Sequence, residues 1–397
     1  MKQLAILGST GSIGRQCLSV VESLTGRFGV VALAAGGNLE ELAGQIKKHK
    51  PEVVSVGDSK RVDELAATLR ERGVARLPAI HHGREGMLAV GTHSKAEIVV
   101  SAAVGVVGLE ATYEAVKLGK TVALSNKEVL VAAGELVMAA AQKAGRELLP
   151  VDSEHNAVHQ CLRGGTREEV RRLVLTASGG PFRKTPLAAL SNATPEQALA
   201  HPNWRMGNRI TIDSATMMNK GFEIIEARWL FGVPPDQIDV VVHPQSTIHS
   251  MVEFVDGSVL AQLGPTDMRM PIQYALTYPE RATSNKEVAL DWTRLKRLDF
   301  EKASTRRFPC LRLAREAMKK GGAFPCALNA ADEIAVAAFL QRRLAFLGIP
   351  EVIERVLIRT PRVRFERMDD VLTADAEARR MAREEVEKLA VAAAAVS

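Results

Sequence analysis

The chain has 397 residues, of which 46% are hydrophobic and 25% are charged, and its formal net charge is +6. This length exceeds what one hydrophobic core usually holds, so two or three folded domains are expected, and the apolar content excludes a disordered chain. The charge is modest, and no apolar stretch reaches the roughly 20 residues of a membrane span, so we expect neither nucleic acid nor a membrane as partner.

The N-terminus combines a strand with a glycine turn. The predicted strand Gln3 to Leu7 runs directly into Gly8 to Gly14, and a helix follows. Glycine permits a close approach of phosphate, whose charge is met by the free amides at a helix start. The spacing is GxxGxxG rather than GxGxxG, so a dinucleotide cradle and a simple turn both stay open. Because the strand begins at residue 3, we expect no targeting segment and a cytoplasmic location.

The next strand bears on the choice of cofactor. It runs from Val30 to Ala35 and ends without the acid that an NAD-binding domain places against the ribose 2′-hydroxyl. Glu40 and Glu41 follow in a first helical turn, where acids are expected for dipole reasons alone. The missing acid favours NADP, although no arginine replaces it.

The remaining pattern predicts three domains. Strands alternate with helices over 1–150, which indicates βαβ units and an NADPH-binding domain. Residues 151–285 mix strands with one long helix, 286–310 form a charged linker, and 311–397 are helical. We therefore expect an α/β protein with an N-terminal Rossmann-like parallel sheet, a central α+β catalytic domain, and a C-terminal helical domain.

Two carboxylates follow the last strand of the first domain. Asp152 and Glu154 lie at the carboxyl end of a predicted sheet strand, where open α/β folds bind ligands. Their i, i+2 spacing points both side chains the same way in an extended chain, which suits a hard cation such as Mg²⁺ or Mn²⁺. A helix N-cap is the competing interpretation of this segment alone.

A third carboxylate shifts that balance. A helix predicted to begin near Ser214 places an apolar stripe on one face and Asn219, Lys220 and Glu223 on the opposite face. Solvent exposure is the usual explanation of a polar stripe, but these groups beside a helix start also suit a phosphate and a metal-bound polyol. Glu226, one turn further on, is expected at the surface or in an ion pair.

Two loops complete the candidate site. Thr176 to Pro181 contains Ser178 and two glycines, which suits a phosphate-binding turn or a plain connection. His201 to Gly207 carries a histidine and Trp204 outside any periodic element, and such a segment can act as a mobile cover.

Together these segments resemble the 1-deoxy-D-xylulose 5-phosphate reductoisomerase family over essentially the whole chain. The motifs in the order and spacing of that family are GSTGSIG at Gly8, SNKE at Ser125, DSEH at Asp152, ASGGPF at Ala177, HPNW at His201, DSATMMNKG at Asp213, HPQSTIHSMV at His243 and LNAADEIAV at Leu328. The implied reaction converts 1-deoxy-D-xylulose 5-phosphate to 2-C-methyl-D-erythritol 4-phosphate with NADPH, in isoprenoid precursor synthesis by the non-mevalonate pathway.

The resemblance also implies residue roles. The implied NADPH contacts are Thr10, Gly11, Ser12, Ile13, Gly36, Gly37, Asn38, Asn126, Glu128 and Gly207. The implied ligands of Mg²⁺, Mn²⁺ or Co²⁺ are Asp152, Glu154 and Glu223. The implied substrate contacts are Lys127, Ser153, Glu154, Ser178, His201, Trp204, Met206, Ser214, Asn219, Lys220 and Glu223, with catalytic roles for Lys127, Glu154, His201 and Glu223. A homodimer is implied as well, with residues 151–285 as the catalytic and dimerisation domain.

The chain departs from the family pattern at two positions. Many members have lysine where this chain has Gly37, which removes one possible cation for the 2′-phosphate. Asp332 replaces a common asparagine, and we attach no function to it. Two rival interpretations stay open: a simple NADP-dependent dehydrogenase, which needs no set of three carboxylates, and a nucleotide sensor without turnover.

Overall fold

The computed structural model describes residues 1–204, 206–283, 289–293 and 295–396. By its contacts the chain divides into two compact units. Unit 1 comprises Met1–Val129, Val137–Asn156 and Asp267–Val288. Unit 2 comprises Leu130–Leu136, Ala157–Thr266 and Ala289–Ser397. The expected linker 286–310 lies partly outside the described residues, and the two expected domains that flank it both fall largely in unit 2.

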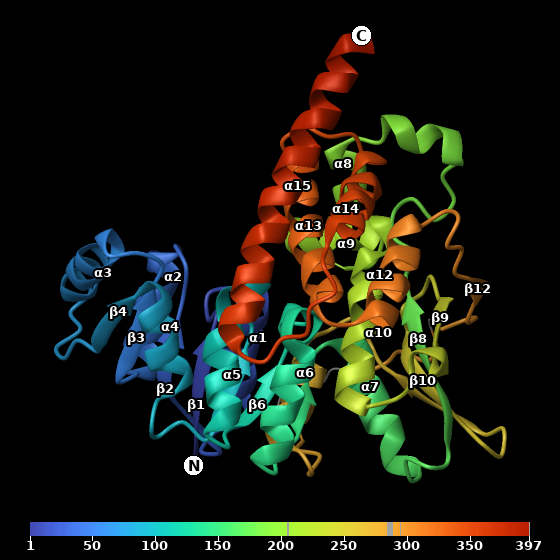
Figure 1. Cartoon of the computed structure of the whole chain (residues 1–397). Helices are drawn as coiled ribbons and strands as arrows, with labels where there is room; N and C mark the ends of the chain where they lie inside the picture. Colours follow the sequence, from blue (N-terminus) through green and yellow to red (C-terminus); the bar gives the residue numbers. More distant parts are fainter. Residues whose placement is uncertain (205, 284–288, 294, 397) are drawn as a thin grey trace. The chain divides into compact units, whose positions relative to one another are not determined.

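Unit 1 is built on a seven-stranded parallel sheet with the strand order β4-β3-β2-β1-β5-β6-β7 (Figure 1). The strands are β1 (Lys2–Leu7), β2 (Phe28–Ala34), β3 (Val53–Val56), β4 (Ala79–His82), β5 (Ile98–Ser101), β6 (Thr121–Leu124) and β7 (Leu148–Pro150). The strand order reverses between β1 and β5. Ligands of open α/β sheets bind at such a switch point, beyond the carboxyl ends of the strands.

Helices complete unit 1. They are α1 (Ser12–Ser23), α2 (Leu39–His49), α3 (Lys60–Glu71), α4 (Gly83–Gly91), α5 (Leu109–Lys117) and α11 (Arg269–Thr277), with most of α6 (Glu128–Lys143) and the start of α7 (Ser153–Cys161). Apart from the edge strand β4, these strands are almost wholly apolar and buried, as expected for a parallel sheet that is covered on both faces. About two turns of α6, residues 130–136, belong to unit 2.

Unit 2 combines a mixed sheet with a helical layer. The sheet order is β11-β10-β8-β9-β12, in which β8 and β9 are parallel and the other pairs are antiparallel. The strands are β8 (Val170–Ala177), β9 (Ile238–Val242), β10 (Ile248–Phe254), β11 (Val259–Leu263) and β12 (Glu301–Lys302). The helices are α8 (Pro195–Leu199), α9 (Asn208–Thr216), α10 (Met218–Phe231), α12 (Pro309–Lys320), α13 (Ala323–Leu340), α14 (Gly348–Arg359) and α15 (Met368–Val396).

One hydrophobic core joins the sheet and the C-terminal helices of unit 2. It includes Leu173 of β8, Phe222 of α10 and Phe339 of α13, and α13 packs against both α14 and α15 (Figure 1). Helix α13 is long and apolar enough to cross a membrane, but 78% of it is buried in the structure, as is usual for a core helix. The fold class predicted from the sequence is confirmed.

Candidate active site

The glycine turn after β1 leaves no room for side chains at two positions. Gly8 has a φ of +88°, and a Cβ there would lie 2.5 Å from the carbonyl oxygen of Ala102. A Cβ on Gly14 would lie 2.4 Å from the carbonyl oxygen of Gly8, so α1 packs tightly on the turn. Thr10 to Ile13 therefore lead into the first turn of α1 at the switch point of the sheet, where free amides can meet a pyrophosphate.

The turn after β2 is open to solvent. Gly36, Gly37 and Asn38 are all exposed, and the side chain of Asn38 accepts a hydrogen bond from the backbone amide of Glu41 at 3.1 Å. Asn38 therefore caps α2 and fixes the path of the chain at this edge of the sheet.

Asn126 organises the loop after β5. Its buried amide group donates hydrogen bonds to the carbonyl oxygens of Ala103 and, at 2.7 Å, Gly105, and its side-chain oxygen accepts from the amide of Glu128 at 3.2 Å. Its side chain thus shapes the wall of the cradle as well as the start of α6.

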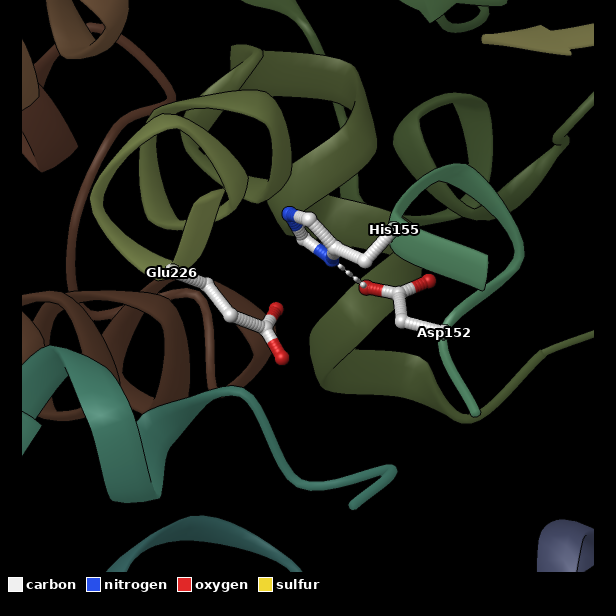
Figure 2. Close-up of side chains that lie close together, drawn as sticks. All are labelled: Asp152, His155 and Glu226. Carbon is white, nitrogen blue, oxygen red and sulfur yellow. Dashed lines mark ion pairs between the residues drawn. The ribbon is translucent and has the colours of Figure 1, made fainter. Parts of the chain in front are cut away.

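Asp152 is held ionised beside a buried lysine. The Nζ atom of Lys127 lies 2.8 Å from Asp152 Oδ2, and His155 Nδ1 lies 3.7 Å from the same oxygen (Figure 2). Burial alone would raise the pKa of Asp152, but the positive charge of Lys127, with a smaller contribution from His155, holds that pKa well below its usual range. A carboxylate that stays ionised at neutral pH is suited to bind a hard cation.

The rest of the Asp152 segment forms the first turn of α7. Ser153 donates a hydrogen bond to the carboxylate of Glu154, and both are half-buried, while His155 is fully buried. Asp152 directly precedes the helix, and its backbone oxygen accepts from the amide of Asn156 at 2.8 Å. The sequence interpretation overlooked His155, although its i+3 spacing from Asp152 in a helical turn indicates their proximity.

The long helix expected from Ser214 is two helices. Met217 adopts a left-handed φ of +62° and separates α9 from α10. Ser214 therefore lies in the last turn of α9, and the prediction that it stands at a helix start is wrong. The helix start nearest to Asn219 and Lys220 is that of α10. A methionine gives no sequence signal for this conformation, because positive φ is uncommon for residues other than glycine.

The charged residues Lys220, Glu223 and Glu226 of α10 are buried, and Asn219 is half-buried. Asn219 donates to Glu223 Oε1 at 2.5 Å, and the Lys220 ammonium group forms an ion pair with Glu223. Lys220 is 3% exposed and Glu223 is 0% exposed. Of the two expectations for Glu226, a surface position is excluded, because the residue is also 0% exposed, and the ion pair stays a prediction. Buried charges require compensation, so these side chains fit a polar site better than a solvated helix face.

Ser178 and His201 meet at the end of β8. His201 Nε2 lies 3.0 Å from Ser178 Oγ, and the Ser178 hydroxyl accepts from the amide of Gly180 at 3.2 Å. Gly179 and Gly180 have φ of +82° and +64°, and a Cβ on Gly180 would lie 2.6 Å from the carbonyl oxygen of Ser214. The glycines thus let the turn pack on the last turn of α9, which brings Ser178, His201 and Ser214 to one region of unit 2.

His201 also shapes its own loop. Its Nδ1 atom accepts hydrogen bonds from the amides of Asn203 at 3.2 Å and Trp204 at 2.9 Å. Burial lowers the pKa of His201, so the ring is neutral at pH 7 and its Nε2–H can donate to Ser178. Met206 is half-buried, and Gly207 is exposed and directly precedes α9.

The HPQS motif serves as a docking point for this loop. Asn203 Nδ2 donates to the carbonyl oxygen of Pro244 at 2.6 Å and to Ser246 Oγ at 3.1 Å. The Trp204 ring lies 6.4 Å from the His249 ring. No role for HPQS followed from the sequence, because the turn that it forms meets the loop only through folding.

Each unit therefore presents one set of polar groups with a distinct chemistry. Unit 1 supplies a glycine turn at a helix start, two carboxylates and a buried ammonium group in Lys127. Unit 2 supplies hydroxyls, a neutral imidazole, an amide, an ammonium group in Lys220 and the carboxylate of Glu223. Carboxylates suit a divalent cation, and the ammonium and hydroxyl groups suit a phosphorylated polyol.

Family models match three segments of the chain. The model described as 1-deoxy-D-xylulose 5-phosphate reductoisomerase matches residues 4–134, and its C-terminal domain model matches residues 148–231. A further model, described as DXP reductoisomerase C-terminal domain, matches residues 263–381.

Whole proteins of the same name are similar over nearly the full length. A relative from Solibacter usitatus is 53% identical over 97% of both chains, and one from Symbiobacterium thermophilum is 51% identical over 97% of this chain and 98% of the relative. The solved enzyme from Zymomonas mobilis in complex with NADPH is 43% identical, with a TM-score of 0.90 over 98% of this chain and 100% of that chain. A DOX-P reductoisomerase in complex with NADPH, fosmidomycin and magnesium is 38% identical, with a TM-score of 0.92 over 98% of both chains.

Proposed function

Because the chain belongs to the 1-deoxy-D-xylulose 5-phosphate reductoisomerase family, we propose that it rearranges and reduces 1-deoxy-D-xylulose 5-phosphate to 2-C-methyl-D-erythritol 4-phosphate. NADPH supplies the hydride and a divalent metal ion polarises the substrate oxygens. The observation that carries this proposal is Asp152, which Lys127 keeps ionised in a segment that matches the family model. Neither a simple dehydrogenase nor a nucleotide sensor needs such a group.

Three carboxylates form the proposed metal site. We propose Asp152, Glu154 and Glu223 as ligands, since all three are carboxylates and hard oxygen donors are what Mg²⁺, Mn²⁺ and Co²⁺ accept. Asp152 and Glu223 each have a lysine within ion-pair distance, which compensates part of their charge when no cation is bound. The alternative set is Asp152 with His155 and Glu226, which offers an imidazole nitrogen in place of one carboxylate oxygen (Figure 2).

The other polar groups are assigned to the substrate. Ser178, Ser214, Asn219 and Lys220 bind its phosphate and neighbouring hydroxyls, because hydroxyl, amide and ammonium donors are the usual partners of phosphate. Ser153 contacts the substrate beside Glu154. Lys127 stabilises negative charge or transfers a proton at the reacting carbons.

The loop with His201, Trp204 and Met206 covers the substrate. The neutral imidazole of His201 orients the Ser178 hydroxyl, and the Trp204 ring excludes water while carbon–carbon bonds break and form. Closure over the bound substrate holds the fragments in place for recombination, which lowers the entropic part of the barrier.

The cofactor contacts complete the assignment. Thr10 to Ile13 bind the pyrophosphate, Gly36 to Asn38 lie at the adenosine end, and Asn126, Glu128 and Gly207 form the remaining contacts. We further propose that Mn²⁺ supports turnover as Mg²⁺ does, that the protein acts in the cytoplasm, and that it forms a homodimer through the sheet of unit 2. Val259 and Leu260 of its edge strand β11 are exposed apolar residues that support this interface.

The experiment separates the two ligand sets. Mn²⁺ binding, followed by electron paramagnetic resonance, is compared for Glu223→Gln and for Glu226→Gln, a matched control one turn away on α10. We expect Glu223→Gln to weaken Mn²⁺ at least about a hundredfold and to slow NADPH oxidation by a similar factor, or roughly 2.7 kcal/mol in barrier. Glu226→Gln should bind Mn²⁺ within about twofold of the unmodified enzyme. The reverse pattern would select Asp152, His155 and Glu226, and substrate-dependent NADPH oxidation in excess EDTA would refute the metal requirement.

A further inference from the structure

A cation lies at the turn where the sequence showed none. Arg61 is in the first turn of α3, and its guanidinium group covers the exposed turn after β2. A Cβ placed on Gly37 would lie 3.4 Å from both Cζ and Nη2 of Arg61. The same group lies over the turn after β3, since a Cβ on Gly57 would lie 2.9 Å from Arg61 Nη1.

The sheet brings these two turns together. Strands β2 and β3 are parallel neighbours, with Ala34 opposite Ser55, so their carboxyl ends lie at the same edge. The amide of Gly57 then donates to the carbonyl oxygen of Gly36 at 2.9 Å, which joins the two turns directly. The absence of a side chain at Gly37 and at Gly57 makes the room that the guanidinium group fills.

Asp58 orients the guanidinium group. Arg61 Nη1 lies 2.9 Å from Asp58 Oδ2, and the backbone amide of Arg61 donates to Asp58 Oδ1 at 3.3 Å. This pairing directs Nη1 toward Asp58 and Gly57 and leaves Nη2 on the side of Gly37. The Arg61 side chain is 40% exposed, so a ligand at the turn can reach it from solvent.

We propose that Arg61 binds the 2′-phosphate of NADPH and so sets the preference of this enzyme for NADPH over NADH. The proposal rests on the proposed cofactor site. In the Rossmann-like fold the adenosine ribose lies at the carboxyl end of β2, and an arginine close to that point accommodates the 2′-phosphate of NADP. A planar guanidinium group is well suited to phosphate, because two parallel N–H donors match two phosphate oxygens.

Arg61 also accounts for Gly37. The lysine that many family members carry at this position would place a second positive charge, an ammonium group, beside the guanidinium group of Arg61. In this chain the cation comes instead from α3, and glycine at position 37 leaves the space for it. Positions 37 and 61 are therefore alternative sources of the positive charge that meets the 2′-phosphate. A lysine at position 37 can then be tested as a replacement for Arg61.

The test measures binding in the absence of substrate. Dissociation constants for NADPH and NADH, and for 2′,5′-ADP and 5′-ADP, are obtained by isothermal titration calorimetry on the full chain. We expect Arg61→Ala to weaken NADPH and 2′,5′-ADP about tenfold, as for one partly exposed charge-assisted contact, and to leave NADH and 5′-ADP within about twofold. Lys60→Ala removes the adjacent exposed cation of the same turn and serves as the matched control, with all four ligands unchanged.

The rescue variant separates a phosphate contact from a structural effect. Gly37→Lys in the Arg61→Ala background should restore most of the lost NADPH affinity, whereas Gly37→Lys alone should add little. Equal weakening of NADPH and NADH by Arg61→Ala would assign Arg61 a structural role and overturn the proposal. Unchanged 2′,5′-ADP binding would also overturn it. Failure of the proposed function would differ, because the unmodified chain would then show no oxidation of NADPH that depends on 1-deoxy-D-xylulose 5-phosphate, whatever its four dissociation constants.

Discussion

Replacing Asp332 with asparagine should stabilise unit 2 at neutral pH. Asp332 of α13 is 0% exposed, and its Oδ2 atom lies 3.6 Å from Arg209 Nη2. That guanidinium group is already shared, because it donates to Asn329 Oδ1 at 2.8 Å and to Glu333 Oε2 at 3.1 Å. The counter-charge of the buried Asp332 carboxylate is therefore the Arg209 guanidinium group, which lies beyond hydrogen-bond distance and also binds Asn329 and Glu333. Burial raises the pKa of Asp332 from 3.8 to about 6, although the charge of Arg209 acts in the opposite direction.

The sign and size of the effect follow from this pKa. A carboxyl group with a raised pKa in the folded state favours folding fully below its unfolded pKa, and that contribution is lost as the pH rises through about 6. A difference of about two pKa units corresponds to about 3 kcal/mol. Asp332→Asn removes this titration, so the variant should match the unmodified protein near pH 4 and exceed its stability by up to about 3 kcal/mol above pH 7.

Urea unfolding followed by tryptophan fluorescence measures this difference. All three tryptophans, Trp204, Trp229 and Trp292, belong to unit 2, so the signal reports on that unit. Glu333→Gln is a control of opposite sign. Burial opposes ionisation there too, but Arg379 and Arg209 lower the pKa of Glu333, so this carboxylate stabilises the fold above its unfolded pKa. That variant should lose stability at pH 7, and the loss should shrink as the pH falls below 4.5. A pH-independent gap between Asp332→Asn and the unmodified protein would refute the reasoning.

Two further outcomes test the loop and the core. Trp204→Ala should raise the substrate KM and lower kcat together, because the ring both contacts the substrate and excludes water. Protease cleavage within 201–209 should slow when a phosphonate analogue binds. If the cleavage rate did not change and the Trp204→Ala variant kept full activity, the loop would be a plain connection. Gly134→Ala should lower the thermal stability by about 1–3 kcal/mol, because its Cβ would lie 2.3 Å from Trp229 Cδ1. Gly44→Ala, whose nearest contact would be 3.9 Å away, should not lower it, and equal melting temperatures of the two variants would contradict the clash.

Much of unit 1 could be predicted from local patterns. Runs of apolar residues such as those of β1 and β5 are buried on both faces of a parallel sheet, so their hydrophobicity is continuous and easily recognised. Strand β4 escaped prediction because it lies at the sheet edge and three of its four residues are exposed or polar, His81 and His82 among them. The break at Met217 could not be predicted either, since tertiary contacts impose a conformation that the residue itself disfavours.

The candidate site divides in the same way. The sequence alone identified the glycine turn after β1, the carboxylates Asp152 and Glu154, and the family, because each depends on residues that are close together in the chain. It could not identify Arg61 as the cation beside Gly37, because only the pairing of β2 with β3 joins their two turns. For the polar face of α10 the sequence left solvent exposure open beside a binding site, and only the structure shows that Glu223 and Glu226 are fully buried. Spacing along the chain determines which side chains share a face, and long-range packing alone decides whether that face meets water or a binding site.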